Sequence, residues 1–420
     1  MKGKLDKQLL IITTLLVIVG MIMIYSATSV MCVKNEKINR STFYLIKQLK
    51  RVLIAAVGFV LALFIDYRLY RKYALVLLTG AAVLMLAIQI PQLTGHAKGA
   101  SRWLELADNA SIQPSELAKL ALLLFLADYL AKRQEIMGDF LHSVLPAVAI
   151  VGVVVGIIAQ QPNYGMAVAI SMIAGVMFFA GGVRISHLVY ITIPALGVIV
   201  YGIMHSQHAF QRVETYLAGG DPLKDAFQIN QSLIAIGAGG FTGKGLGRSM
   251  QKMFYIPEIH TDFVFAVLGE ELGFIGGLSI LVLFILFAWR GLRISMRAPD
   301  RFGQLLAVGI TAMIFIYALL NIGVVIGLLP TTGIPLPFIS YGGSALLVNM
   351  IACGVLLNIS SATESPLDKK LKYINEGPLR GIHASIDGGW RNRWALDPGD
   401  KHSTGTVGSP SENKNTVHWN

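Results

Sequence analysis

Long apolar stretches alternate with short polar ones along most of this chain. The first runs from Leu9 to Met31, and others occupy residues 52–65, 73–92, 114–131, 141–160, 165–181, 187–204, 263–289, 304–328 and 344–360. A helix of about 20 apolar residues crosses the roughly 30 Å hydrocarbon core of a bilayer. The pattern therefore predicts an all-α polytopic membrane protein with about ten transmembrane helices. The first run is longer than the apolar core of about 7–15 residues in a cleaved signal peptide, so we interpret it as a retained span.

Two stretches are too polar to cross a bilayer. Residues 205–262 form a predicted long outer loop, whereas residues 361–420 are rich in Gly, Ser, Asp, Lys and Asn and have no apolar periodicity. A segment as polar as residues 361–420 cannot bury enough apolar surface to offset the entropy lost on folding. We therefore expect a transmembrane domain over residues 1–360 and a polar, disordered cytoplasmic tail over residues 361–420.

The composition excludes a soluble enzyme, because 54% of the residues are hydrophobic and only 14% are charged, against about 25% charged residues in soluble domains. The net charge of +11 comes mainly from clusters between apolar runs, which suits anionic lipid headgroups better than nucleic acid. Arg68, Arg71 and Lys72, and later the turn over residues 290–301, are the clusters that place both termini in the cytoplasm. The basic outer loop 32–51 disagrees with this orientation. Cys32 and Cys353 form no disulfide framework and are expected to pack in the core.

Four polar segments interrupt the apolar pattern on the predicted outer side. They are residues 99–119, the turn Gln161-Pro162-Asn163-Tyr164-Gly165, the end of the long loop at 228–263, and the proline- and glycine-rich stretch 329–344. The first contains Glu116 and Lys119, which lie three residues apart on one helical face. Ionisable residues inside a span either lock the bundle as an ion pair or face a functional cavity. Both interpretations stay open on spacing alone.

Asp262 lies where the long loop enters the eighth predicted span. A partly desolvated carboxylate at such a position can act as a general base, or it can merely cap the helix. Glu258, His260 and Asp262 could instead ligate a metal, although their spacing matches no recognised site. The glycine-rich stretch before them lacks the glycine spacing and the preceding strand of a P-loop, so nucleotide binding is not expected.

Together the four segments resemble the SEDS family (shape, elongation, division and sporulation) over residues 9–360. The matching motifs are Gly-Ala-x-Arg-Trp, Gln-Pro-Ser-Glu-Leu-x-Lys, Gln-Ser-Leu-Ile-Ala-Ile-Gly, Glu-x-His-Thr-Asp-Phe and the stretch from Pro330 to Ser344. The sequence of residues 251–258 is similar to the FtsW and sporulation branch, whereas the sequence of residues 334–338 is similar to the RodA branch. We favour the FtsW branch. One departure is Asn163, where the family usually has Asp, so a role for charge in that turn is in doubt.

The resemblance implies a peptidoglycan glycosyltransferase that polymerises lipid II on the outer face of the bacterial cytoplasmic membrane, in septal wall synthesis. Asp262 would be the catalytic residue that activates the acceptor hydroxyl. The predicted substrate contacts are Arg102, Trp103, Glu116, Lys119, Gln231, Lys252, His260, Ser340 and Tyr341. The family resemblance also implies a divalent cation, of unknown ligands, and no organic cofactor.

The same resemblance implies a class B penicillin-binding transpeptidase as partner, together with other division or elongation membrane proteins and no nucleic acid. Two alternatives remain at this stage. The chain could be a RodA-like polymerase for cell elongation, or a lipid II flippase that performs no chemistry. The position of Asp262 at an outer mouth favours the enzyme, because transporters place their binding sites near the midplane.

Overall fold

The computed structural model describes residues 5–34, 40–90, 103–107, 110–218, 227–251 and 261–362. Within these ranges nearly every segment is helical. The helices are α1 (Lys7–Lys34), α2 (Phe43–Phe64), α3 (Tyr67–Ala87), α4 (Pro114–Lys132), α5 (Leu145–Gln160), α6 (Tyr164–Ala180), α7 (Ile185–His205), α8 (Gln207–Ala218), α9 (Phe227–Gly239), α10 (Val264–Arg297), α11 (Arg301–Val325) and α12 (Gly343–Ala362). A 3-10 turn, η2 (Gln134–Ile136), and a π-helical turn, η3 (Phe140–Val144), lead into α5.

Each predicted apolar run coincides with one of these helices. Among the described residues, 7 helical segments are long and apolar enough to cross a membrane: α1, α3, η3 with α5, α7, α10, α11 and α12. Helix α6 is apolar but has only 17 residues, and α2 and α4 carry several charged side chains. The chain is therefore a multi-pass membrane protein. The stretch predicted as a long outer loop itself contains the two helices α8 and α9.

The all-α prediction was wrong in one place. Strand β1 (Leu104–Ala107) pairs in antiparallel fashion with β2 (Ala110–Ile112). Strands of three or four residues are too short for their apolar periodicity to be separated from loop or helix by sequence. The hairpin is fixed from outside, because the hydroxyl of Ser344 donates a hydrogen bond to the main-chain oxygen of Ser111.

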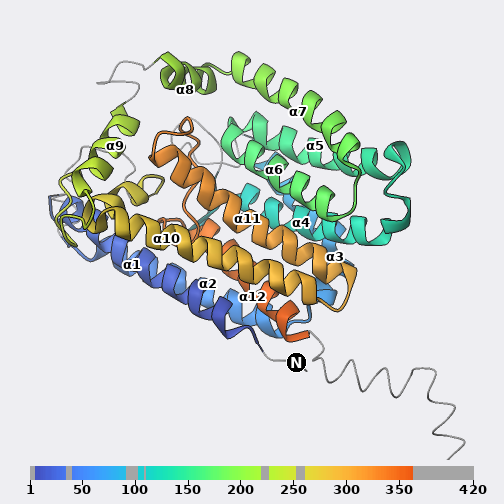
Figure 1. Ribbon diagram of the computed structural model, residues 1–420, viewed down its shortest axis with the longest axis horizontal. Coiled ribbons are helices and arrows are strands. Elements are labelled where there is room, and N and C mark those ends of the chain that lie inside the picture. Colours follow the sequence, from blue (N-terminus) through green and yellow to red (C-terminus); the bar gives the residue numbers. More distant parts are fainter. Residues whose placement is uncertain are drawn as a thin grey trace, which may run out of the picture. The chain divides into compact units, whose positions relative to one another are not determined.

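Helix α11 lies at the centre of the bundle, where it packs against α4, α6, α10 and α12 (Figure 1). Most of its side chains are buried, as are most of those in α12. Helix α7, by contrast, has no buried residue and lies at the edge of the bundle beside α6. A helix that is apolar all round and unburied has its favourable surroundings in lipid, which agrees with its hydropathy.

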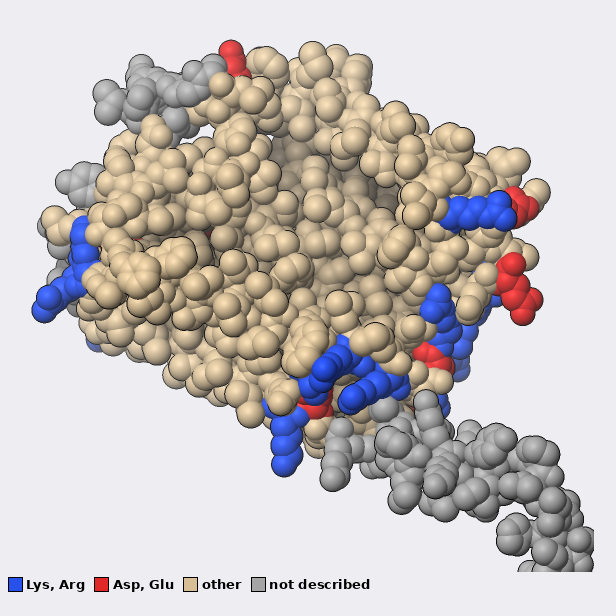
Figure 2. Space-filling view, in the orientation of Figure 1, with Lys and Arg blue, Asp and Glu red and all other residues tan. Residues whose placement is uncertain are grey.

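One end of the bundle collects basic residues, and we call it the basic end. Here the carboxylate of Asp6 accepts a hydrogen bond from Arg290, and its main-chain N–H donates to Ser360, which joins the start of α1 to α10 and the end of α12. The hydroxyl of Tyr67 likewise donates to Asp300, between α10 and α11. Most of the Lys and Arg side chains in view in Figure 2 lie along this end. The basic clusters used to predict the orientation therefore share one end of the bundle.

Candidate active site

The four polar segments predicted from sequence meet at the end of the bundle opposite the basic end. The main-chain N–H of Gln113, at the start of α4, donates a 3.1 Å hydrogen bond to the hydroxyl of Ser344, at the start of α12. The turn before α6 packs on the same proline-rich loop, since a Cβ on Gly165 would lie 2.5 Å from the carbonyl oxygen of Thr332. The segments are far apart in sequence, and their contacts create one polar region.

Asp262 lies in this region, half-buried and immediately before α10. Its Oδ2 atom lies 3.7 Å from the position that a Cβ on Gly333 would occupy. Gly333 has a φ of 69°, a backbone conformation that L-residues with a Cβ adopt only at a cost. The carboxylate therefore faces the main chain of the loop between α11 and α12 at a point where no side chain intervenes.

Asn321 fixes the main chain on both sides of this contact. Its side-chain amide, buried in α11, donates hydrogen bonds of 2.8 Å to the carbonyl oxygen of Asp262 and of 2.8 Å to that of Ile334. A single amide thus ties the start of α10 to the loop that bears Gly333. Sequence reasoning missed this residue, although an amide inside an apolar run of spanning length is a signal for a functional or structural contact.

Helix α10 breaks its regular geometry about three turns beyond Asp262. Gly273 has φ 67° and ψ −164°, which is outside the helical region. The loop over residues 240–251 inserts at this break: its Phe241 carbonyl accepts from Ile275, and its Lys244 N–H donates 3.0 Å to the carbonyl of Glu270. A Cβ on Gly273 would lie 2.3 Å from the main-chain nitrogen of Gly243, so glycine is required for this close approach.

Two buried carboxylates secure that loop. Glu270 accepts from the Lys244 ammonium at 2.8 Å, from the Ser249 hydroxyl at 2.5 Å and from the N–H of Met250 at 3.1 Å. Glu271 accepts from the hydroxyl of Ser26 in α1 at 2.6 Å. Both glutamates have 0% exposure, and charges survive such burial only when they are paired and hydrogen-bonded. Both fall within the predicted apolar run 263–289, and nothing in that pattern indicates that they hold the loop.

Glu116 and Lys119 form a buried ion pair near the start of α4. Their charged atoms are 2.6 Å apart, and the two side chains are only 1% and 2% exposed. The Lys119 ammonium also lies 4.2 Å from the centre of the Tyr317 ring in α11, an attractive cation–π arrangement. In this structure the ammonium therefore points to its own helix and to α11.

The other predicted contact residues lie at different places. Trp103 is 44% exposed, and Gln231 is half-buried on α9, a helix that is held to α11 by a 2.9 Å hydrogen bond from Ser232 to Val325. The hydroxyl of Ser340 accepts from the N–H of Leu336 and shapes the loop. Arg102, Lys252 and His260 are outside the described residues.

Tyr341 belongs to an aromatic and basic contact with α2. Its ring centre lies 4.2 Å from the guanidinium carbon of Arg51 and 5.3 Å from the ring of Tyr44. Burial raises the pKa of the Tyr341 hydroxyl above its usual value, and the charge of Arg51 acts in the opposite direction. The phenol is thus a neutral group at neutral pH, suited to hydrogen bonding.

Asn163 caps α6, with its side-chain oxygen accepting from the N–H of Met166 at 3.4 Å. A neutral amide is sufficient for this helix cap, so the predicted turn is present without the charge of an aspartate.

With respect to metals, no group of three His, Cys, Asp or Glu side chains comes together within the described ranges. Fewer than three side chains of these four types are therefore available within those ranges to a cation at Asp262.

The fold and the converging segments define a polytopic membrane protein with a polar region at one end of its bundle. A family model described as a cell cycle protein, that of FtsW, RodA and SpoVE, matches residues 6–365. The chain belongs to this family.

Individual relatives support the same family. The chain is 40% identical to a probable peptidoglycan glycosyltransferase FtsW of Trichlorobacter lovleyi, over 87% of this chain and 96% of the relative. It is 43% identical to the stage V sporulation protein E of Bacillus subtilis, over 84% of this chain and 96% of that protein. Among solved structures, a chain from a peptidoglycan synthase complex superposes with a TM-score of 0.69 at 25% identity, covering 85% of this chain and 98% of the other.

Proposed function

We propose that the chain is a peptidoglycan glycosyltransferase that polymerises lipid II, with Asp262 at its reaction centre. The observation that carries this proposal is the position of Asp262: its carboxylate faces the loop main chain at Gly333, and its own main chain is fixed by Asn321. Relatives that share about two fifths of its residues over most of the chain bear the name of that enzyme. Such a rigid support is what a general base requires, because a misplacement of about 1 Å is costly in rate.

In the proposed reaction Asp262 accepts the proton of the 4-hydroxyl of the acceptor GlcNAc. The hydroxyl oxygen forms a bond to the anomeric carbon of the donor MurNAc, and the bond from that carbon to undecaprenyl diphosphate breaks. The leaving diphosphate carries the electron pair away. A general base typically contributes about 10²–10⁴-fold to such a rate.

A divalent cation fits this arrangement only if the substrate supplies most of its ligands. Magnesium in phosphate chemistry is commonly held by one or two carboxylates together with phosphate oxygens, and Asp262 is a carboxylate of that kind. The chemistry supplied by a bound cation is neutralisation of the leaving diphosphate. Exposed cations of the described loop, such as Arg248, could assist in the same way.

We infer that the Glu116–Lys119 ion pair has a structural role. Their mutual 2.6 Å contact and the ring of Tyr317 occupy the ammonium, so the pair would hold α4 against α11, the helix that carries Asn321. In that role the pair supports the reaction centre indirectly, through the packing of α11, and does not contact lipid II.

The proposal includes about ten membrane-crossing helices, cytoplasmic termini and a location in the bacterial cytoplasmic membrane. Support comes from the apolar helices and from the shared position of the basic clusters. A class B penicillin-binding transpeptidase is the proposed partner, since the similar structure belongs to a complex that coordinates polymerization and crosslinking. Septal synthesis is the proposed setting, because several of the named relatives are FtsW proteins.

The experiment that tests this function uses the full chain purified with the co-expressed transpeptidase, whose own active-site serine is replaced. Fluorescent lipid II is added, and the products are separated by size on a gel. A ladder of glycan strands supports the proposal. Unchanged lipid II, with a folded complex present, contradicts it.

A further inference from the structure

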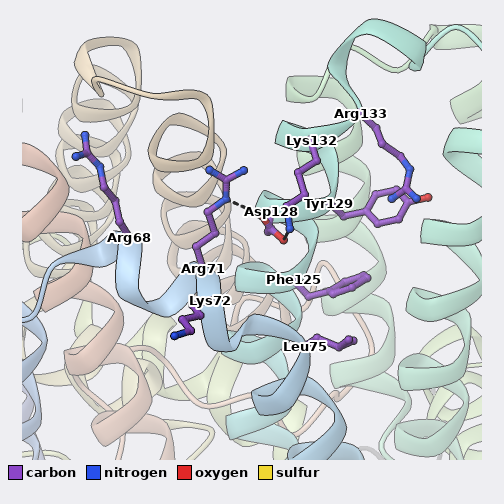
Figure 3. Close-up of a pocket in the computed structure, with 9 residues that line it drawn as sticks. All are labelled: Arg68, Arg71, Lys72, Leu75, Phe125, Asp128, Tyr129, Lys132 and Arg133. Atoms are coloured by element: carbon purple, nitrogen blue, oxygen red, sulfur yellow. Dashed lines mark hydrogen bonds and ion pairs between the residues drawn. The ribbon is translucent and has the colours of Figure 1, made fainter.

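A concave region of about 490 Å³ lies at the basic end of the bundle, between α3 and α4. The residues that line it are Arg68, Arg71, Lys72, Leu75, Phe125, Asp128, Tyr129, Lys132 and Arg133 (Figure 3). We call it the α3–α4 cavity. It is separate from the region around Asp262, which lies at the other end of the bundle.

The cavity has a surplus of positive charge. Its acidic lining residue is Asp128, whose two oxygens lie 2.6 Å from Arg71 Nε and 2.6 Å from Lys132 Nζ. Figure 3 shows that these three side chains meet across the gap between the helices. Lys132 remains 59% exposed and Arg71 41% exposed, so both have donor groups available for a further anion.

Arg133 adds a cation that no described carboxylate neutralises. Its guanidinium carbon lies 4.1 Å from the centre of the Tyr129 ring, and no ion pair joins it to a described residue. The stacked arrangement holds the guanidinium beside the cavity while leaving donors for planar recognition of a phosphate. One carboxylate is thus faced by several cations in a small space.

The same cavity continues onto an apolar surface. Phe125 and Leu75 line it together with the charged residues, and Leu75 is 58% exposed on α3. The next residue, Val76, is 65% exposed. Helix α3 is long and apolar enough to span a membrane, so these side chains lie where acyl chains would contact the protein.

We propose that the α3–α4 cavity binds the phosphate-bearing headgroup of an anionic membrane lipid. The headgroup would contact Arg71, Lys132 and Arg133, with its acyl chains along Leu75 and Val76. Basic cavities between membrane helices on the cytoplasmic side are suited to such headgroups. Free phosphate could contact the same cations, but it would make no use of the apolar wall. The bound lipid adds a bridge between α3 and α4, the helix whose other end carries Glu116 and Lys119.

The test measures lipid retained by the full-length chain. The protein is purified in detergent, incubated with equal amounts of phosphatidylglycerol and phosphatidylcholine of the same acyl composition, and examined by native mass spectrometry. The variant Lys132→Gln with Arg133→Gln removes two cations but leaves the Arg71–Asp128 contact between the helices. The control Lys7→Gln with Arg297→Gln removes the same charge from exposed positions at the basic end. A third variant, Asp128→Asn, removes the competing carboxylate.

We expect the wild-type protein and the control to prefer phosphatidylglycerol. The preference should fall by about tenfold or more in the cavity variant, since each Lys or Arg near anionic lipid contributes about fivefold, and it should rise in Asp128→Asn. Inorganic phosphate at millimolar concentration should leave the bound lipid in place. Equal preference in the cavity and control variants would overturn the proposal. Displacement by inorganic phosphate would also overturn it and assign the cavity to a free anion.

Discussion

The side-chain amide of Asn321 donates a 2.8 Å hydrogen bond to the main-chain oxygen of Asp262. The same amide bonds Ile334, so the start of α10 and the proline-rich loop are held by one residue of the central helix. This contact fixes the residue that the sequence marks as catalytic.

Replacement of Asn321 by Leu should reduce glycan polymerisation per folded molecule. The change removes the amide donor from the carbonyl oxygens of Asp262 and Ile334, at a cost of up to about 1–3 kcal/mol for a group left unsatisfied, and it releases the main chain at Asp262. Asn358→Leu is a matched control, because that amide also makes two main-chain contacts, to Leu63 and Tyr67, at the basic end. Both variants should lower the melting temperature. Equal activity of the two folded variants would show that Asn321 is no more than a structural residue.

Gly333→Ala should impair activity by placing an apolar methyl group against the carboxylate of Asp262. An L-residue at φ 69° costs about 1–2 kcal/mol, and the new methyl would contact Asp262 Oδ2 at 3.7 Å. Gly327→Ala is the control: it has the same kind of strain, with φ 75°, but its methyl would face Leu233. The rate of lipid II polymerisation should fall more in the first variant than in the second. A larger loss of rate in Gly327→Ala than in Gly333→Ala would contradict this prediction.

The Glu116–Lys119 pair can be tested by neutralisation. Lys119→Met alone leaves a buried carboxylate, which costs about 3–5 kcal/mol, so we expect poor folding or low activity. Glu116→Gln combined with Lys119→Met removes both charges and should recover much of the loss. Activity is measured in membranes that contain equal amounts of protein. If the double variant accumulates normally yet stays inactive, the ammonium serves the substrate directly, as the sequence predicted.

Orientation is tested by cysteine labelling in intact cells. The native Cys32 and Cys353 are buried and can be replaced by Ala. A cysteine at Leu246, 58% exposed in the loop over residues 240–251, should react with an impermeant maleimide from outside. A cysteine at Arg297, exposed at the basic end, should react only after the cells are opened. Labelling with the opposite pattern would place the Asp262 region in the cytoplasm.

The sequence predicted the long helices of the bundle well, because a run of about 20 apolar residues is a signal contained within one segment. It also identified the segments that meet around Asp262, since proline, glycine and charge interrupt the apolar runs there. It did not predict the β1–β2 hairpin, which depends on Ser344 from a distant helix. Nor did it predict helices α8 and α9 inside the polar stretch.

The roles of Asn321, Glu270 and Glu271 could not be predicted for the same reason. Their partners lie between 13 and 245 residues away in sequence, and no local spacing encodes such contacts. For Glu116 and Lys119 the helical spacing did predict proximity, which the 2.6 Å ion pair confirms. Spacing could not indicate that both side chains are almost completely buried.

The measurement closest to the central claim compares wild-type protein with Asp262→Asn and Asp262→Glu in lipid II polymerisation. Each is purified as a complex with a catalytically inactive transpeptidase, and melting curves confirm equal folding. Loss of a general base should lower the rate of chain growth by about 10²–10⁴-fold in the Asn variant, without weakening the retention of lipid II to the same degree. The Glu variant should retain more activity than Asn. Near-normal glycan strands from Asp262→Asn would contradict the assignment of Asp262 as the base.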